Sequence, residues 1–182
     1  MKICFIYTDT NGLHHTNDIV STKNLYNYAR LIALHYIVGE YENNIFTETK
    51  QISSILKPKT INFDKTAMKI HNITMEKAIQ DGINNDIIIS QLKNDIKDVD
   101  IIVSHNLLFH IKAIQVECFR TAINIDFTKF ILIDTISFIH TFNFPKLTEL
   151  IKKLKIKDSN TMQLYQIKNV FFKLYNDYII KL

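Results

Sequence analysis

The sequence has few of the residues that bend or cross-link a chain: three glycines, two prolines and two cysteines among 182 residues, and no tryptophan. Isoleucine, asparagine and lysine are abundant instead, a bias typical of A+T-rich coding sequences such as those of large DNA viruses or parasites. The bias says nothing about mechanism. The sequence also lacks repeats, low-complexity tracts and linkers, so with 47% hydrophobic residues we expect a single domain over residues 1–182.

The two cysteines, Cys4 and Cys118, lie within apolar stretches and lack the spacing of metal ligands. They indicate buried thiols in a reducing compartment rather than a disulfide. No apolar run reaches the ~18 residues that a membrane span requires, and the residues up to Tyr7 lack the length and cleavage site of a signal peptide. We therefore expect an intracellular protein without membrane contact. The cytoplasm, the nucleus and a viral factory all stay open.

The charge of the chain is nearly balanced. The net charge is +4, and Lys and Arg are interleaved with Asp and Glu along most of the sequence. Such a balance favours an anionic partner only weakly.

Three stretches in the first third of the chain have the composition and the alternation of β-strands. The predicted strands span residues 2–8, 29–41 and 45–57. We expect them to form an antiparallel meander joined by short polar turns.

Helical patterns alternate with short apolar strands in the remainder of the chain. Asp64 and Thr74 stand where helix N-caps are expected, and Asn85 or Asp86 is expected to cap a third helix. Pro145 is expected in the first turn of a later helix. The predicted helices span 63–71, 74–81, 85–97, 108–121, 145–154 and 162–182, and the predicted strands span 99–106 and 129–134. This order predicts an α/β domain with a mixed sheet.

Six segments then follow one another in a familiar order. They are FIYTDTNGL (5–13), KIHNIT (69–74), DIIVSHNLLFHIKAIQVECFR (100–120), IDTISF (133–138), FPKLTELIKKL (144–154) and LYQIKNVFFKLY (164–175). In order and spacing they resemble the motifs of the DnaQ-like 3′ to 5′ exonucleases of the DEDD superfamily. The resemblance covers nearly the whole chain and implies a ribonuclease H-like fold, with a mixed five-stranded sheet flanked by helices.

The resemblance also implies a metal site, because these enzymes hydrolyse a terminal phosphodiester with two divalent metals. Four carboxylates hold the metals, since Mg²⁺ and Mn²⁺ prefer hard oxygen ligands. In the first motif, Tyr7 stands where the family has a bridging Asp, and Asp9 stands in place of the Glu. In the middle motif, His110 stands in place of the Asp. Histidine is a poor magnesium ligand, and a neutral phenol cannot offset two cations.

The last motif departs from the family as well. Asn169 stands in place of the fourth carboxylate, and Leu164 replaces the general-base histidine. Tyr165 lies four residues before Asn169, as the base does in the tyrosine-bearing branch, so it is either a residual base or a packed core residue. By this alignment, Asp9 alone keeps a carboxylate, and the metal site is expected to be weak.

Residues that match the family's nucleotide-contacting loops are candidates for nucleic-acid binding. They are Asn11, Gly12, Leu13, His14, His105 and Asn106. His14, in the loop after the first strand, is expected either to contact phosphate or to be solvated. His105 and Asn106 are also expected to have a structural role, in which they organise the loop beside the site.

Three hypotheses on function follow from the resemblance. The first is a catalytically degenerate protein that serves as a binding or scaffolding subunit in replication, repair or RNA processing, with a protein partner and no metal. The second is an active exonuclease with a site rebuilt around Asp9 and His110, using Mg²⁺ or Mn²⁺ with His14 or Asp134. The third is a module that binds nucleic acid without cleaving it.

Overall fold

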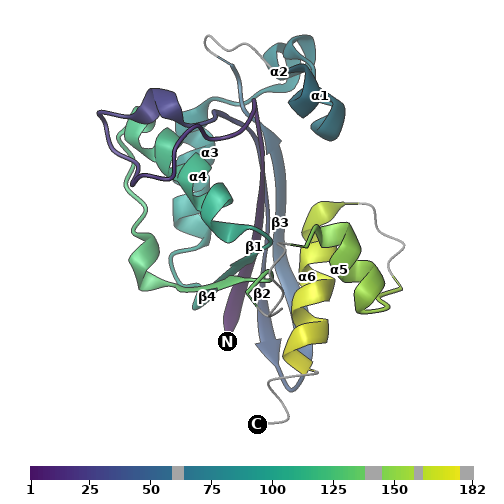
Figure 1. Cartoon of the computed structure of the whole chain (residues 1–182). Coiled ribbons are helices and arrows are strands. Elements are labelled where there is room, and N and C mark those ends of the chain that lie inside the picture. Colours follow the sequence, from purple (N-terminus) through teal and green to yellow (C-terminus); the bar gives the residue numbers. More distant parts are fainter. Residues whose placement is uncertain (59–63, 138–144, 158–161, 177–182) are drawn as a thin grey trace.

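The computed structural model describes residues 1–58, 64–137, 145–157 and 162–176. Its centre is a five-stranded sheet with the strand order β3-β2-β1-β4-β5 (Figure 1). The strands are β1 (Lys2–Thr10), β2 (Leu31–Glu42), β3 (Ile45–Ile55), β4 (Ile101–Ser104) and β5 (Ile131–Asp134). The first three are antiparallel neighbours, whereas β4 and β5 run parallel to β1. The predicted mixed sheet and its meander are therefore confirmed.

The two connections within the meander differ in length. Asn43 and Asn44 alone join β2 to β3, with φ values of 50° and 63°, a two-residue hairpin geometry that asparagine tolerates better than most residues. Between β1 and β2 the chain makes a long excursion over residues 11–30, which contains the 3-10 helix η1 (Leu25–Asn27). The expectation of short turns is thus wrong for the first connection.

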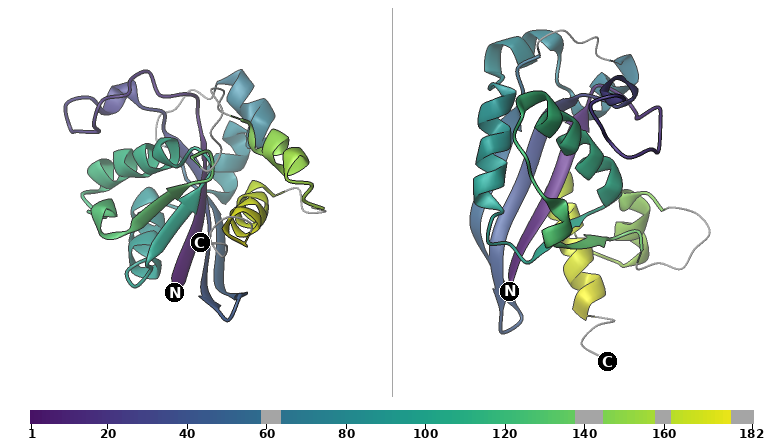
Figure 2. Two further views of the ribbon diagram at one scale, coloured as in Figure 1. Left: turned by 60° about the horizontal axis from the view of Figure 1, so that its bottom comes forward. Right: turned by 90° about the vertical axis from the view of Figure 1, so that its left-hand side faces the viewer.

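Helices cover both faces of the sheet (Figure 2). One face carries α3 (Asn85–Asp95) and α4 (Leu107–Thr121), and the other carries α6 (Gln163–Leu174), against which α5 (Leu147–Lys153) packs. The pleat of β1 supplies both cores: Cys4 and Ile6 pack on the α3/α4 side, and Ile3 and Phe5 pack on the α6 side. Successive side chains of a strand point to opposite faces, which explains this alternation.

Two short helices, α1 (Lys65–His71) and α2 (Met75–Asp81), lie beyond the end of the strands (Figure 1). Asp64 caps α1 by accepting hydrogen bonds from the backbone N–H groups of Thr66 (2.8 Å) and Ala67 (3.0 Å). Thr74 caps α2 through the backbone N–H of Lys77 (3.2 Å). These two predicted N-caps are confirmed, as expected where a short polar side chain precedes a helical run. The N-cap expected at Asn85 or Asp86 is wrong, because α3 already begins at Asn85 and its N-cap is Asn84.

The structure corrects two helix boundaries. Helix α5 begins at Leu147 with Lys146 as its N-cap, whose backbone N–H donates to the Glu149 carboxylate at 3.1 Å. Pro145 therefore precedes the helix instead of opening it. The final helix, expected over 162–182, is described as α6 only to Leu174, and residues 177–182 lie outside the described part.

The two cysteines are free and buried in the core on the α3/α4 side, as predicted. Burial raises the pKa of both thiols, that of Cys118 to about 12. Every helix in the described part of the chain is too short or too polar to cross a membrane.

Candidate functional site

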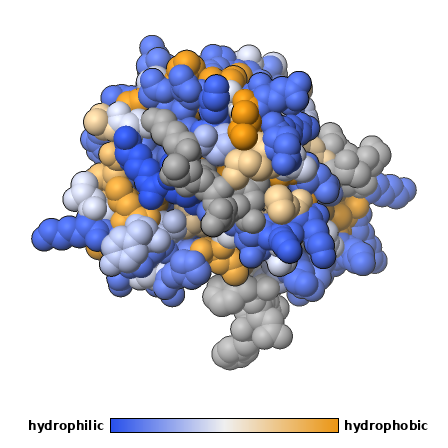
Figure 3. All heavy atoms as spheres, turned by 90° about the horizontal axis from the view of Figure 1, so that it is seen from above, coloured by the Kyte–Doolittle hydropathy of each residue, from blue (hydrophilic) through white to orange (hydrophobic). Residues whose placement is uncertain are grey.

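A cleft of about 940 Å³ opens at the edge of the sheet where β1 ends. Its walls come from β1 and the residues after it, from α1, from the turn into α4 and from the end of the 11–30 excursion. Figure 3 looks onto this end of the molecule, where apolar side chains lie scattered among hydrophilic ones. Because β1 and β4 are parallel and end at the same edge, the residues that follow them converge there. This cleft is the candidate site.

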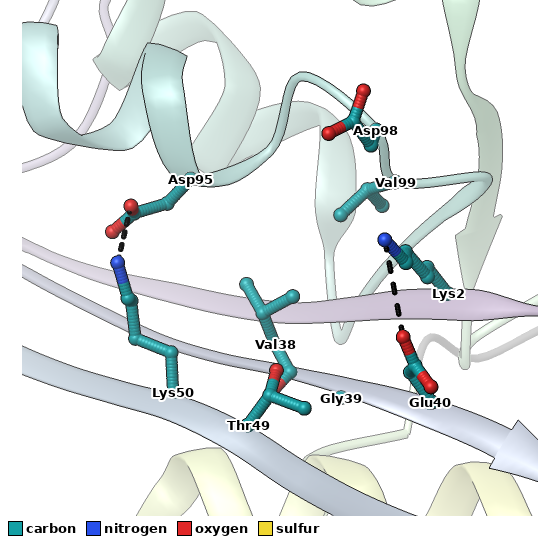
Figure 4. A pocket seen from close by; sticks show the side chains of 9 residues that line it. All are labelled: Lys2, Val38, Gly39, Glu40, Thr49, Lys50, Asp95, Asp98 and Val99. Carbon is teal, nitrogen blue, oxygen red and sulfur yellow. Dashed lines mark hydrogen bonds and ion pairs between the residues drawn. The ribbon is translucent and has the colours of Figure 1, made fainter.

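A smaller hollow of about 290 Å³ lies beside the opposite end of β1 (Figure 4). Four of the charged side chains that line it lie in pairs: Lys50 lies 2.6 Å from Asp95, and Lys2 lies 3.8 Å from Glu40. The fifth, Asp98, lies 3.9 Å from Lys97. Asp95 also accepts a hydrogen bond from the hydroxyl of Tyr36 at 2.7 Å. Since these charges are matched within the protein, the hollow is a weaker candidate than the large cleft.

The retained carboxylate, Asp9, lies at the edge of the cleft beside a histidine. Tyr7 and Asp9 share one face of β1, and the strand register places His35 of β2 opposite Tyr7. His35 Nε2 lies 3.0 Å from Asp9 Oδ2, and His35 Nδ1 lies 2.8 Å from Ser53 Oγ. The side chains of Asp9 and His35 are only 12% and 16% exposed. The Asp9 carboxylate thus has a hydrogen-bond partner within the protein.

Tyr7 lies beside this carboxylate, on the same face of β1. Asp9 and Gln163, the first residue of α6, both influence the pKa of its phenol. Burial, and then the charge of Asp9, raise the pKa of Tyr7 well above its ordinary value. The phenol therefore stays neutral at physiological pH, at the position that the sequence resemblance matches to a second carboxylate.

His110 projects from α4 and binds the backbone of β1. Strand β4 pairs with β1 only as far as Phe5, and the backbone N–H of Thr8 donates instead to His110 Nδ1 at 3.1 Å. His110 Nε2 donates to the carbonyl of His105 at 3.2 Å. Burial lowers the pKa of His110 to about 4. The ring is therefore neutral, and both of its nitrogens are hydrogen-bonded within the protein.

These side chains do not form a metal site of the kind that the family uses. The described residues that line the cleft include two carboxylates, Asp9 and Asp64. Asp9 is paired with His35, and Asp64 caps α1. Across the described ranges, no three His, Cys, Asp or Glu side chains gather in a group that could hold a metal ion. Two metals that need several hard oxygen ligands do not fit this donor set.

Asp134, a further candidate ligand, has a structural role. Its carboxylate accepts the backbone N–H groups of Asn106 (2.9 Å), Leu107 (2.8 Å) and Ile136 (3.0 Å). Asn106 itself has φ 63°, in the left-handed region that asparagine tolerates. Asp134 thus ties the end of β5 to the start of α4.

Most of the predicted nucleic-acid-binding residues lie in the cleft wall. They are Asn11, Gly12, Leu13, His105 and Asn106. The Leu13 side chain is 75% exposed. His105 is held in the wall by Thr135 Oγ1 (2.9 Å from Nδ1) and by the carbonyl of Pro145 (3.0 Å from Nε2).

His14 does not line the cleft; its neighbour His15 does. The ring of His14 stacks on Phe109 with 4.4 Å between centroids, and its Nε2 donates to the carbonyl of Phe109 at 3.0 Å. Its Nδ1 accepts the backbone N–H of Ala29 at 3.1 Å. His14 therefore fastens the 11–30 excursion to α4.

Helix α6 presents other residues to the site than those the alignment selects. The hydroxyl of Tyr165 donates to Gln51 of β3 at 2.9 Å, and Leu164 is buried in the core on that face. Neither Tyr165 nor Asn169 is among the described residues that line the cleft. Gln163 instead reaches Tyr7. The only sequence signal for Gln163 as a site residue was its place as a polar residue at the start of the helix.

The sequence reasoning missed a second charged group in the cleft. Glu117 of α4 is fully buried and pairs with Arg30, whose Nε lies 2.8 Å from Glu117 Oε1. Arg30 and Arg120 both line the cleft, as does the exposed Tyr26. No local pattern marks these residues, because they come from two segments far apart in the sequence.

Comparison with solved structures finds close matches to the whole chain. Exonuclease I without ligand has a TM-score of 0.74 at 15% identity, over 99% of this chain and 44% of that one. E. coli exonuclease I in complex with a dT13 oligonucleotide has a TM-score of 0.74 at 15% identity, over 99% of this chain and 42% of that one. Exonuclease I from Methylocaldum szegediense has a TM-score of 0.74 at 13% identity, over 99% of this chain and 41% of that one. No protein-family model and no curated protein sequence matches the chain.

The chain has the ribonuclease H-like α/β fold of the exonucleases, with a mixed five-stranded sheet between helices. The predicted fold is therefore confirmed. The chain spans less than half the length of the exonuclease I chains that it matches. At this level of identity the likeness defines the fold, and function has to be argued from the site.

Proposed function

We propose that this chain is a catalytically degenerate exonuclease-fold protein, a binding subunit in nucleic-acid metabolism that holds a single strand in its cleft without cutting it. It works inside the cell and needs no metal. The observation that carries the proposal is the state of Asp9, whose carboxylate is paired with His35 and lies beside the neutral phenol of Tyr7.

The chemistry of hydrolysis supports this reading. Two-metal cleavage needs a cluster of anionic oxygens to fix both cations beside the attacking and leaving oxygens. Here the neutral phenol of Tyr7 and the neutral imidazole of His110 stand at two of the positions that resemble carboxylate positions of the family. Both ring nitrogens of His110 are hydrogen-bonded, one to Thr8 and the other to His105, so this ring can bind a metal only if one of those bonds breaks. A neutral phenol at Tyr7 adds no charge that would offset a cation.

The persistence of the cleft supports a binding role. Exonuclease I is found in complex with a dT13 oligonucleotide and, in other structures, with SSB. Our chain has the same fold and a cleft of about 940 Å³ at the end of β1. We propose that it binds a single strand there, and that a protein partner recruits it.

A nuclease assay tests the absence of cleavage. Purified protein is incubated with end-labelled single-stranded DNA or RNA and with Mg²⁺ or Mn²⁺, beside the Asp9→Ala variant. We expect no metal-dependent shortening with either protein. Shortening by the wild type that Asp9→Ala abolishes would contradict the proposal and favour an active site rebuilt around Asp9 and His110.

A further inference from the structure

The far wall of the cleft carries two arginines held by one buried carboxylate. Arg30 donates to Glu117 through Nε (2.8 Å) and Nη2 (3.3 Å). Arg120, one turn further along α4, has Nη1 3.9 Å from the same carboxylate. Glu117 is fully buried and also accepts a hydrogen bond from Asn85 Nδ2 at 2.8 Å. Glu117 therefore fixes both guanidinium groups in the wall.

An exposed aromatic side chain stands beside this pair. Arg120 Nη2 donates to the carbonyl of Leu25 at 3.2 Å, which places the following residue, Tyr26, next to the arginines. Tyr26 is 79% exposed and lines the same cleft as Arg30 and Arg120. An exposed ring at this place offers a face on which a nucleic-acid base can stack.

The local charge balance favours an anion. Two guanidinium groups share one carboxylate, which leaves an excess positive charge in the wall. Burial and the charge of Arg30 lower the pKa of Arg120, against the opposing effect of Glu117. A bound anion would relieve the repulsion between the two arginines. Arg120 is 24% exposed and Arg30 is 19% exposed, so both can be reached from the cleft.

We propose that Tyr26, Arg30 and Arg120 form a binding site for one stretch of single-stranded nucleic acid, with a phosphate on the arginines and a base stacked on Tyr26. We call this group the arginine wall. Guanidinium groups bind phosphate through paired N–H donors, and stacking on aromatic rings is how proteins bind single strands without sequence preference. The inference rests on the proposed function, because it names the surface that holds the strand.

The test measures binding of fluorescent oligothymidylate and oligouridylate between about 50 and 200 mM salt. Tyr26→Ala is expected to weaken binding about 5- to 100-fold, the range found when a stacking aromatic is removed. Arg120→Gln is expected to lower the slope of log affinity against log salt by about 0.7, the loss of one phosphate contact to a single strand.

Two matched variants serve as controls. Phe119→Ala removes an aromatic residue that is 46% exposed and not among the described residues lining the cleft, and Lys97→Gln removes a cation whose side chain is 71% exposed. Both are expected to bind like the wild type. Arg30 is not substituted in this test, because its removal would leave the buried Glu117 without its nearest ion-pair partner.

The outcomes separate the inference from the function on which it rests. Wild-type binding that Tyr26→Ala and Arg120→Gln leave unchanged would overturn the arginine wall while a binding role stands. A wild type that binds neither oligonucleotide at low salt would overturn both. A preference for one oligonucleotide, lost in Tyr26→Ala, would support the wall and identify DNA or RNA as the ligand.

Discussion

The two sides of the cleft differ in which charged groups face it. On the β1 side, Asp9 is paired with His35 and lies beside the neutral phenol of Tyr7. On the arginine wall, the carboxylate is the buried group, and Arg30 and Arg120 face the cleft. The cleft thus has an enclosed carboxylate on one side and guanidinium groups facing it on the other, which is the charge distribution that the proposed binding of a strand requires.

Removal of the buried charge on the arginine wall should have the largest effect on stability. Glu117→Gln leaves Arg30 largely buried beside a neutral amide, and breaking one partner of such a pair costs about 3 kcal/mol of unfolding free energy. Urea unfolding measures the loss. The control Glu40→Gln breaks the exposed pair with Lys2 and should cost at most about 1 kcal/mol. Equal losses in the two variants would mean that Glu117 does not organise the wall.

The second-largest effect on stability should come from acidification, through His110 on the β1 side of the cleft. The folded protein lowers the pKa of His110 from 6.5 to about 4, so the unfolded chain binds the proton more readily. The stability due to the neutral ring is present above pH 6.5 and is lost as the pH falls towards 4. We expect the unfolding free energy to drop by about 2 kcal/mol between pH 7 and pH 5.

Variants of two cleft histidines check the origin of this pH dependence. His110→Gln should remove much of this drop in urea unfolding and leave a smaller one due to His14, His71 and His105, whose pKa values are also lowered by burial. His15→Gln, in the exposed part of the cleft, should leave the full drop in place. If the full drop persists in His110→Gln, another group is responsible for it.

The smallest effect concerns the hydroxyl of Tyr7. Tyr7→Phe removes a hydroxyl that lies near Asp9 and Gln163 and should cost at most about 1 kcal/mol of unfolding free energy, the usual net contribution of a hydrogen bond. Tyr26→Phe, on the arginine wall, should change stability by less than about 0.5 kcal/mol because that side chain is exposed. A stabilising Tyr7→Phe substitution would show that the β1 side is strained.

Much of the fold could be predicted because its signals are local. Strand alternation set the faces of β1, and the N-caps Asp64 and Thr74 marked two helix starts. The prediction that Pro145 opens α5 was wrong because the neighbouring Lys146 and Glu149 already form the cap of this helix. The excursion over residues 11–30 was misjudged because its hydrogen bonds run to distant α4.

The sequence alone determined that Tyr7 and Asp9 share one face of a strand, and that His110 stands in a helix after β4, since both follow from local periodicity. The tertiary structure decided what those side chains touch. His35 meets Asp9 only through the register of β1 on β2, and Arg30 meets Glu117 across 87 residues. Pairings of this kind depend on how strands and helices pack, and no local pattern of residues specifies them.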